Sequence, residues 1–264
     1  EIIRMLQKLE IPILDIPSID DLTSRKTKIN SFRPIPIDEL LGREAIEAQD
    51  ELMELAVKNK IILITGAGGS IGSELCKQAL RYKPKKIILL EISEVNLYKI
   101  NEELSNFEAQ NFSLIPVLGS SCNYRLVNKL ISNHKVEIIF HAAAYKHVPL
   151  VEINPINGIR NNIFSTYTVC KAAFQNNIKK VILISTDKSV RPTNVMGASK
   201  RVAELIIQAY ANEKDIKESK NDNSKKTLFS IVRFGNVLGS SGSVVPKFER
   251  QIKTGGPITI THPN

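Results

Sequence analysis

Three side chains that can move protons stand together after an apolar stretch. A buried strand is predicted over Val181–Thr186, and Thr186, Asp187 and Lys188 follow one another at its carboxyl end. Polar residues at that end of a parallel strand face the ligand crevice of an α/β sheet. A hydroxyl, a carboxylate and an ammonium in one place can carry out acid–base catalysis. The alternative is that Asp187 and Lys188 form an ion pair that only caps a loop.

A second candidate group begins a predicted helix over Asn194–Asn212. Met196 and Lys200 are four residues apart, so they share one face of this helix. Lys200 can donate hydrogen bonds, whereas the thioether of Met196 has no proton to give. We expect both residues to belong to the same site as the group after the preceding strand.

A glycine-rich turn follows the apolar run Ile61–Thr65 and precedes a predicted helix over Ser70–Tyr82. Glycines allow a tight turn and a close approach of the backbone to a pyrophosphate, while the helix N-terminus offers N–H groups and a positive dipole end. A turn that only packs the helix on the strand is the alternative. The cofactor-binding residues expected here are Gly66, Gly68, Gly69, Ser70, Ile71 and Gly72.

The second predicted strand, Lys86–Glu91, ends on a carboxylate about 20 residues after the glycine-rich turn. A carboxylate at this place accepts hydrogen bonds from the adenosine ribose and repels a 2′-phosphate. Glu91 therefore favours NAD over NADP. Lys85 and Lys86 precede the strand, so we expect them at its far end, where they cannot offset this preference.

Two further loops complete the expected cofactor crevice. Ser120 and Ser121 follow the third strand and are expected to border the adenine. The fourth strand runs into three small residues that let the backbone lie against a dinucleotide, namely Ala142, Ala143 and Ala144. For His141 and His147 we favour a positional or packing role over a chemical one.

Strands and helices alternate from Lys60 onward, which predicts a parallel sheet with helices on both faces. The fold class is therefore α/β, a Rossmann-type doubly wound sheet. Strands are expected at Ile61–Thr65, Lys86–Glu91, Phe112–Leu118, Val136–His141, Val181–Thr186 and Leu228–Phe234. Helices are expected at Ser70–Tyr82, Glu94–Phe107, Tyr124–Ser132, Pro155–Asn176 and Asn194–Asn212. The charged segment Glu213–Lys226 is expected to be a loop.

The domain organisation follows from where this alternation starts and stops. Residues 1–59 are expected to be a linker and an N-terminal helical segment, with helices at Glu1–Leu9 and Glu44–Lys58 and a short strand at Ile11–Ile16. Residues 60–236 are expected to form the NAD-binding Rossmann domain. Residues 237–264 are expected to begin a small substrate-binding part that is cut short. Because the first residue is Glu1, we expect a piece of a longer chain.

Composition excludes few classes of protein. Lys and Arg number 36 against 27 Asp and Glu, for a formal charge of +9. The basic residues are scattered, which argues against a nucleic-acid groove and favours an ordinary lysine-rich surface. The spacing of the three cysteines, Cys76, Cys122 and Cys170, fits no metal site, so we expect no metal. We expect their thiols to be reduced, as in the cytosol. No apolar run approaches the roughly 20 residues of a membrane span, and no signal peptide is visible.

Several of these motifs together resemble one family. Thr65-Gly66-x-x-Gly69-x-x-Gly72, followed later by Lys200, resembles the extended short-chain dehydrogenases/reductases. Ser185–Arg201, His141–Pro149 and Arg233–Ser240 resemble, more narrowly, the nucleotide-sugar 4,6-dehydratases of polysaccharide biosynthesis. The resemblance covers residues 30 to 264. Met196 stands where most of the wider family has Tyr, as it does in the large membrane-anchored dehydratases.

The resemblance implies NAD-dependent 4,6-dehydration of a UDP-N-acetylhexosamine, with UDP-N-acetylglucosamine as the expected substrate. Asp187 would be the acid and Lys188 the base at sugar C-5. Thr186 would hydrogen-bond at sugar C-4 in place of the missing Tyr, and Lys200 would hold the nicotinamide ribose. The substrate-binding residues expected are Lys146, His147, Arg233 and Asn236.

The large members of this family carry a membrane region and a nucleotide-fold domain before the catalytic domain. Residues 1–22 resemble the tail of that preceding domain, and Asp38–Glu44 resembles the joining segment. The resemblance thus implies a cytoplasmic domain whose parent chain is anchored to the inner membrane through a region absent here, and leaves a homo-oligomer open. Two rival functions stay open: a sugar-nucleotide epimerase, which needs no acid–base pair for water loss, and a non-catalytic NAD-binding module.

Overall fold

The chain separates into two compact units, Glu1–Ala48 and Gln49–Asn264. The computed structural model describes residues 14–15, 33–34, 48–105, 107, 112–218, 227–237 and 244–260. In the first unit the described residues form an antiparallel pair of short strands, β1 (Leu14–Asp15) and β2 (Arg33–Pro34). β1 falls within the predicted strand Ile11–Ile16. The predicted helix Glu1–Leu9 lies outside the described residues.

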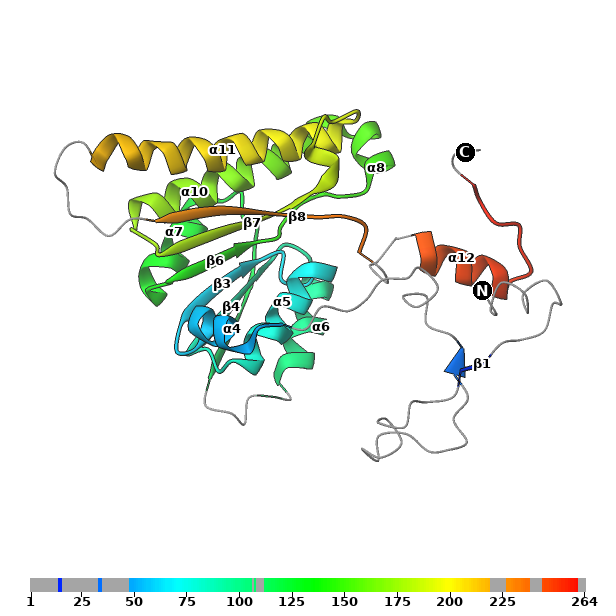
Figure 1. The fold of residues 1–264 in the computed structure, drawn as a ribbon, viewed down its shortest axis with the longest axis horizontal. Coiled ribbons are helices and arrows are strands. Elements are labelled where there is room, and N and C mark those ends of the chain that lie inside the picture. The colour runs from blue at the N-terminus through cyan, green and yellow to red at the C-terminus, as the bar shows by residue number, and fades with distance from the viewer. Residues whose placement is uncertain are drawn as a thin grey trace. The chain divides into compact units, whose positions relative to one another are not determined.

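The second unit is built on a six-stranded sheet in the order β5-β4-β3-β6-β7-β8, and every neighbouring pair is parallel. The strands are β3 (Ile61–Thr65), β4 (Lys86–Glu91), β5 (Ser113–Leu118), β6 (Ile138–His141), β7 (Lys180–Thr186) and β8 (Leu228–Phe234). The chain starts at the centre of the sheet, moves outward to β5, and returns to β6 on the other side of β3 (Figure 1). This is the strand order of the Rossmann fold, which confirms the predicted fold class.

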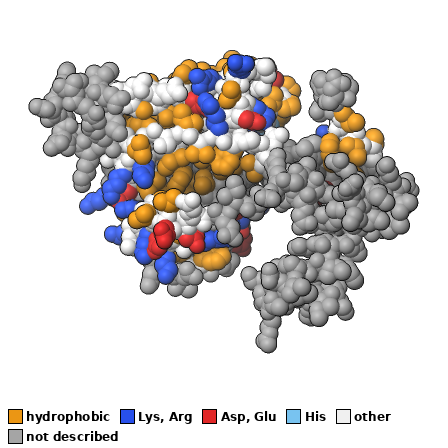
Figure 2. Space-filling view, in the orientation of Figure 1, with side chains coloured by type: hydrophobic (Ala, Val, Ile, Leu, Met, Phe, Trp, Pro, Cys, Tyr) orange, Lys and Arg blue, Asp and Glu red, His pale blue; other side chains and the backbone are white. Residues whose placement is uncertain are grey.

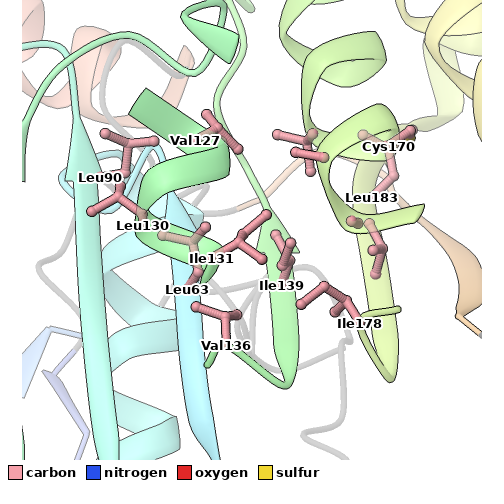
Figure 3. Packing of buried hydrophobic residues seen from close by; sticks show 14 of the residues in the cluster. Leu63, Leu90, Val127, Leu130, Ile131, Val136, Ile139, Cys170, Ile178 and Leu183 are labelled. Carbon is pink, nitrogen blue, oxygen red and sulfur yellow. The ribbon is translucent and has the colours of Figure 1, made fainter. Parts of the chain in front are cut away.

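Helices cover both faces of the sheet. One face carries α4 (Asp50–Val57), α5 (Ser70–Arg81) and α6 (Glu94–Ser105). The other carries α7 (Tyr124–His134), α10 (Ser165–Gln175) and α11 (Val195–Glu218). Side chains alternate across a strand, so Ile62 and Ile64 pack in the first layer while Leu63 packs in the second. Figure 3 shows the second layer, with Leu63 and Ile139 of the sheet near Ile131 of α7, and Leu183 of the sheet beside Cys170 of α10.

Two regions of helix differ from the prediction. The single helix expected over Pro155–Asn176 is divided into α9 (Pro155–Ile159), a π-helical turn over Arg160–Phe164, and α10. The π-helical turn contains Asn162, whose buried side chain hydrogen-bonds groups outside the helix. Periodicity could not reveal this extra residue in the turn. α8 (Val148–Ile153) and α12 (Val244–Lys253) were not predicted.

The predicted loop over Glu213–Lys226 is wrong for its first part, because α11 continues to Glu218. Glu and Lys are good helix formers, and the sequence places Lys217 four residues after Glu213, a favourable spacing in a helix. A charged segment with few apolar residues is therefore compatible with a helix as well as with a loop. Residues 219–226 lie outside the described part of the chain.

Candidate active site

The carboxyl ends of the strands surround one cleft of about 1220 Å³. Its walls come from the segments after β3, β6, β7 and β8, with contributions from the segments after β4 and β5. The cleft thus lies at the reversal of strand order between β3 and β6, where α/β sheets bind ligands. Its volume exceeds the roughly 300–1,000 Å³ of most small-molecule pockets. That size suits two ligands held side by side.

Most of the predicted site residues line this cleft, but five of them do not. The predicted residues that line it are Gly68, Gly69, Ser70, Ile71, Gly72, Ser120, Ala142, Ala144, Lys146, His147, Thr186, Lys188, Met196, Lys200 and Asn236. The predicted residues outside the lining are Gly66, Glu91, Ala143, Asp187 and Arg233. The structure gives each of these five a different set of contacts.

The glycine-rich turn is closed by backbone contacts that exclude side chains. A Cβ on Gly72 would lie 2.0 Å from the carbonyl oxygen of Gly66. Gly66 itself has a φ of +65°, and a Cβ there would lie 2.7 Å from the backbone of Ala143. Helix α5 then begins at Ser70 without a side-chain cap from Gly69 and without an acidic residue in its first turn. Its positive end therefore faces the cleft without a charged residue of its own first turn beside it, which fits the pyrophosphate of a dinucleotide.

Glu91 is buried and braces the glycine-rich turn. Its Oε2 accepts a hydrogen bond from the backbone N–H of Gly68 at 3.0 Å. Its Oε1 accepts from the N–H groups of Ile92 and Ser93, each at 3.0 Å. The ribose contact expected of Glu91 stays a prediction, and the structure adds a bracing role that the sequence did not reveal. Lys86 begins the strand that Glu91 ends, so it lies at the opposite edge of the sheet, as predicted.

His141 has a positional role, as we favoured. The Thr166 hydroxyl donates to the carbonyl oxygen of Asn162, so it can only accept from His141 Nε2, which lies 3.1 Å away. Burial lowers the pKa of His141 to about 3, and the ring is neutral. Nδ1 must then accept from the Thr65 hydroxyl at 2.7 Å. This chain joins β3, β6 and the π-helical turn beneath the backbone of Ala142–Ala144.

The predicted catalytic group forms a tight turn. Thr186 precedes a 3₁₀ turn over Asp187–Ser189 and accepts the N–H of Lys188 on its hydroxyl. Lys188 Nζ lies 3.2 Å from Asp187 Oδ1 and donates to Asn236 Oδ1 at 3.0 Å. The Asp187 side chain is 56% exposed. A hydrogen bond from the Thr186 hydroxyl, and then Lys188, hold the pKa of Asp187 below its usual value. Asp187 is therefore ionised in the free protein.

Helix α11 presents Met196 and Lys200 to the cleft, one turn apart, as the spacing predicted. Lys200 Nζ donates to the carbonyl oxygen of Ile184 at 2.7 Å. Burial lowers the pKa of Lys200 to about 8, although nearby Glu204 opposes the shift. A Cβ on Gly197 would lie 2.3 Å from the carbonyl oxygen of Lys188. Gly197 thus lets the 3₁₀ turn touch the start of the helix.

Sequence reasoning missed Glu204, which is fully buried next to this group. Arg233, which we expected to bind substrate, instead donates to Glu204 through Nε at 2.8 Å and Nη2 at 2.6 Å. The substrate contact of Arg233 stays a prediction. The only signal for Glu204 in the sequence is its position four residues after Lys200 on the same helix.

Tyr145 and Asn162 were also missed. Tyr145 lines the cleft. Asn162 holds its backbone from both sides, because Oδ1 accepts the Tyr145 N–H at 2.7 Å and Nδ2 donates to the Tyr145 carbonyl oxygen at 3.0 Å. Asn162 Nδ2 also donates to Ser199 at 2.9 Å. The segment after β6 is thereby tied to the helix that carries Lys200.

Residues 62–264 match the family described as polysaccharide biosynthesis protein. The chain belongs to this family. It is 44% identical over 253 residues to the capsular polysaccharide biosynthesis protein CapD of Staphylococcus aureus, covering 96% of this chain and 41% of CapD. It is 37% identical over 213 residues to a UDP-N-acetylglucosamine 4,6-dehydratase (inverting) of Campylobacter jejuni, covering 76% of this chain and 57% of that protein. A UDP-glucose 4-epimerase of Rickettsia rickettsii is 36% identical over 209 residues, covering 78% of this chain and 57% of that protein.

Solved structures agree with the family at the level of the fold. Pen from Bacillus thuringiensis is 37% identical with a TM-score of 0.69, over 78% of this chain and 61% of that chain. DesIV, a dTDP-glucose 4,6-dehydratase from Streptomyces venezuelae solved with NAD bound, is 19% identical with a TM-score of 0.60, over 75% and 63%. The chain spans about two fifths of the length of CapD.

Three further features of the described residues are the distribution of side chains on one face, possible metal sites and possible membrane spans. On the face shown in Figure 2, Lys and Arg lie in several small groups, and apolar side chains gather in the middle, where β8 runs in Figure 1. Leu228 and Val232 of this edge strand are 46% and 42% exposed. Within the described ranges no three His, Cys, Asp or Glu residues come together as a metal site. No described helix is long and apolar enough to cross a membrane.

Proposed function

We propose that this chain catalyses the NAD-dependent 4,6-dehydration of a UDP-N-acetylhexosamine, with UDP-N-acetylglucosamine as the substrate. The product would be a 4-keto-6-deoxy sugar nucleotide for surface polysaccharide or glycan synthesis. One observation carries the proposal: Lys188 enters the cleft beside Asp187, while Met196 occupies the wall where the wider family has Tyr. The identity to a protein named as a UDP-N-acetylglucosamine 4,6-dehydratase supports it.

The residues present fit NAD. The glycine-rich turn and the start of α5 would hold the pyrophosphate, Ala142–Ala144 would lie against the dinucleotide, and Lys200 would donate to the nicotinamide ribose. When bound, NAD would supply the acceptor and donor of hydride that the reaction needs at sugar C-4 and C-6. Ser120 and Asn96 line the cleft on the side of β4 and β5, where the adenine would lie.

The chain's own residues must move two protons during the loss of water. Removal of the C-5 proton needs a neutral amine at Lys188, because an ammonium cannot accept a proton. Departure of the C-6 hydroxyl as water needs a protonated Asp187, because hydroxide is a poor leaving group. Thr186, between Asp187 and the cleft, would hydrogen-bond the C-4 hydroxyl. In the free protein Asp187 is in the opposite state, ionised and paired with the Lys188 ammonium.

A sugar bound against Lys188 would resolve this conflict by shielding the ion pair from water. Desolvation disfavours the charged forms of both groups. Transfer of one proton from Lys188 Nζ to Asp187 Oδ1, which are 3.2 Å apart, then gives an amine and a carboxylic acid at once. Lys188 accepts the C-5 proton and Asp187 gives its proton to the departing hydroxyl, so the loss of water leaves the pair as ammonium and carboxylate, as in the free protein. Two further proton transfers balance each other over a turnover, because the C-4 hydroxyl releases one proton on oxidation and C-5 takes up one proton when the hydrogen is added at C-6.

A sugar-nucleotide 4-epimerase is the second candidate, favoured by the identity to a protein with that name. An epimerase does not lose the C-6 hydroxyl, so it needs no acid beside Lys188. A non-catalytic NAD-binding module would change no sugar. Incubation with UDP-N-acetylglucosamine and NAD, followed by mass spectrometry, separates the three. A loss of one water supports dehydration, an isomer of unchanged mass supports epimerisation, and unchanged substrate supports the binding module.

The acid role is tested by Asp187→Asn, with Asp50→Asn as the matched control. Asp50 is an exposed carboxylate on α4 that accepts a hydrogen bond from Tyr82, outside the cleft. We expect Asp187→Asn to retain NAD affinity and to lose dehydration by about 10²–10⁴-fold, the usual contribution of general acid catalysis. The control should keep full activity. If Asp187→Asn retains more than about a tenth of the rate, the acid is another residue.

We further propose that the domain works at the cytoplasmic face of the inner membrane, tethered through a region that precedes it in the parent chain. The resemblance of residues 1–22 and Asp38–Glu44 to a preceding domain and a joining segment supports this, as does the greater length of CapD. Fractionation of cells that express the complete reading frame tests it. The protein should stay with the membranes after an alkaline carbonate wash, and recovery in the soluble fraction would refute the tether.

A further inference from the structure

We propose that Glu204 is a positioning residue for dehydration, and that its carboxylate holds the turn carrying Thr186, Asp187 and Lys188 against the cleft. This inference rests on the proposed function. Glu204 lies on α11, one turn beyond Lys200, and its side chain is fully buried. It does not line the cleft, so it acts through the residues that do.

The carboxylate joins three other parts of the fold. Ser185 at the end of β7 donates to Oε1 at 2.7 Å. Ser189, which ends the 3₁₀ turn, lies 2.6 Å from Oε1 and 2.6 Å from the carbonyl oxygen of Thr186. Arg233, near the end of β8, contacts both oxygens. Ser185 and Ser189 thus flank the catalytic turn on both sides, and Glu204 holds each of them.

The same carboxylate controls the far wall of the cleft. Arg233 is three residues before Asn236, and Asn236 Oδ1 accepts the hydrogen bond from Lys188 Nζ at 3.0 Å. The ion pair between Arg233 and Glu204 therefore fixes the position of the end of β8. Through it, the pair fixes the place at which Asn236 contacts Lys188. The position of Lys188 is determined twice, once through the turn and once through β8.

The negative charge of Glu204 is needed as well as its shape. Arg201 donates to Oε2 at 3.0 Å, so two guanidinium groups and the buried ammonium of Lys200 surround one carboxylate. Burial alone would raise the pKa of Glu204, but hydrogen bonds from Arg233, Ser189, Ser185 and Arg201 lower it to about 2. A neutral amide would leave these cations without a counter-charge and would accept fewer hydrogen bonds. The turn and β8 would then separate.

The test compares Glu204→Gln with Glu137→Gln in the full chain. Glu137 is the matched control because it is also a partly buried carboxylate with several donors, namely Lys179, Lys60 and the N–H of Ile61. It lies at the amino ends of β3 and β7, the edge of the sheet opposite the cleft. Both variants should lose stability, so a merely structural effect appears in both.

Only Glu204→Gln should disturb the cleft. We expect its kcat to fall about 10–100-fold with KM changed less than about threefold, since a displacement of about 1 Å in a reacting group can cost about 10²-fold. NAD affinity should change much less than kcat: no described hydrogen bond joins Glu204 to the glycine-rich turn, and only Lys200, which would hold the nicotinamide ribose, loses a counter-charge. Equal kcat values for Glu204→Gln and wild type, or an equal loss in both variants, would overturn the proposal.

Amide hydrogen exchange gives a second measurement that needs no substrate. The N–H of Val190 donates to the carbonyl oxygen of Asp187 at 3.0 Å and reports closure of the turn. Its exchange should accelerate in Glu204→Gln and not in Glu137→Gln, and equal rates in the two variants would also overturn the proposal. If wild type forms no dehydrated product, the proposed function fails, and this exchange experiment still decides whether Glu204 holds the turn.

Discussion

Each half of the cleft is organised around one buried carboxylate, but the two carboxylates have different partners. On the cofactor side, Glu91 accepts hydrogen bonds from three backbone N–H groups, those of Gly68, Ile92 and Ser93. On the catalytic side, Glu204 accepts only from side chains among its described hydrogen bonds. The first half is therefore shaped by the main chain, and the second by charges and hydroxyl groups.

Because of this difference, different kinds of substitution should damage the cofactor half and the catalytic half of the cleft. Backbone donors are present whatever the side chains are, so the cofactor half is sensitive mainly to added volume at its glycines. Side-chain donors disappear with a single substitution, and arginines keep their charge at every pH at which the protein folds. The catalytic half should therefore respond strongly to a loss of charge at Glu204.

Acid should expose this charge dependence most strongly. The pKa of Glu204 is about 2 in the folded protein against a usual 4.5. A lowered acid pKa contributes stability that is present above about pH 4.5 and lost as the pH falls toward 2. The shift corresponds to about 3 kcal/mol. In urea unfolding, the stability difference between wild type and Glu204→Gln should shrink by about that amount between pH 7 and the acid limit. A difference that stays constant with pH contradicts this account.

Added volume should separate the halves through two glycines. In Gly72→Ala the new methyl meets the carbonyl oxygen of Gly66, and in Gly197→Ala it meets the carbonyl oxygen of Lys188. Each substitution should cost about 1–3 kcal/mol of stability, as overpacking does. Gly72→Ala should weaken NAD binding in calorimetry, and Gly197→Ala should slow dehydration with NAD affinity retained.

Each of these two variants is the control for the other, because each should change only one of the two properties. The comparison between the halves breaks down if Gly197→Ala weakens NAD binding as much as Gly72→Ala does. It breaks down equally if Gly72→Ala leaves NAD affinity at the wild-type value.

The smallest expected effect concerns the choice of dinucleotide. We predict that NAD binds at least about tenfold more tightly than NADP, or about 1.4 kcal/mol, because the Glu91 carboxylate repels a 2′-phosphate. Glu91→Ala should narrow this ratio in calorimetry. The same substitution removes the brace from Gly68, so the affinity for NAD itself should also fall. Equal affinities of the wild type for NAD and NADP would refute the assignment of Glu91.

The cofactor half could be predicted from the sequence because its determinants are local. β3 and β4 have the bounds predicted around their apolar runs, and the glycines between β3 and α5 lie close together along the chain. A positional or packing role for His141 was also favoured over a chemical one. Such features depend on residues close in sequence, which periodicity and turn chemistry describe well.

The catalytic half was predicted in its residue types but not in its arrangement. Thr186, Lys188, Met196 and Lys200 meet at the cleft as expected. The protonation of Asp187 depends on a balance between burial and two hydrogen-bonding neighbours, which no spacing reveals. Glu204 escaped notice because its partners Ser185 and Arg233 come from two strands and meet it only in the folded chain.

The hydrogen-bond chain through His141 also makes the protein suited to spectroscopy. The Nε2 proton is enclosed between Thr166 and the sheet, so it should exchange slowly with solvent and give a resolved imidazole N–H resonance. Because Thr65 and Thr166 allow only this tautomer, the ¹⁵N shifts of the two ring nitrogens should differ widely. The Thr65 hydroxyl also accepts the N–H of Ala143 at 3.4 Å. A ligand that presses on the backbone after β6 would therefore be reported by one buried resonance, without a label on the ligand.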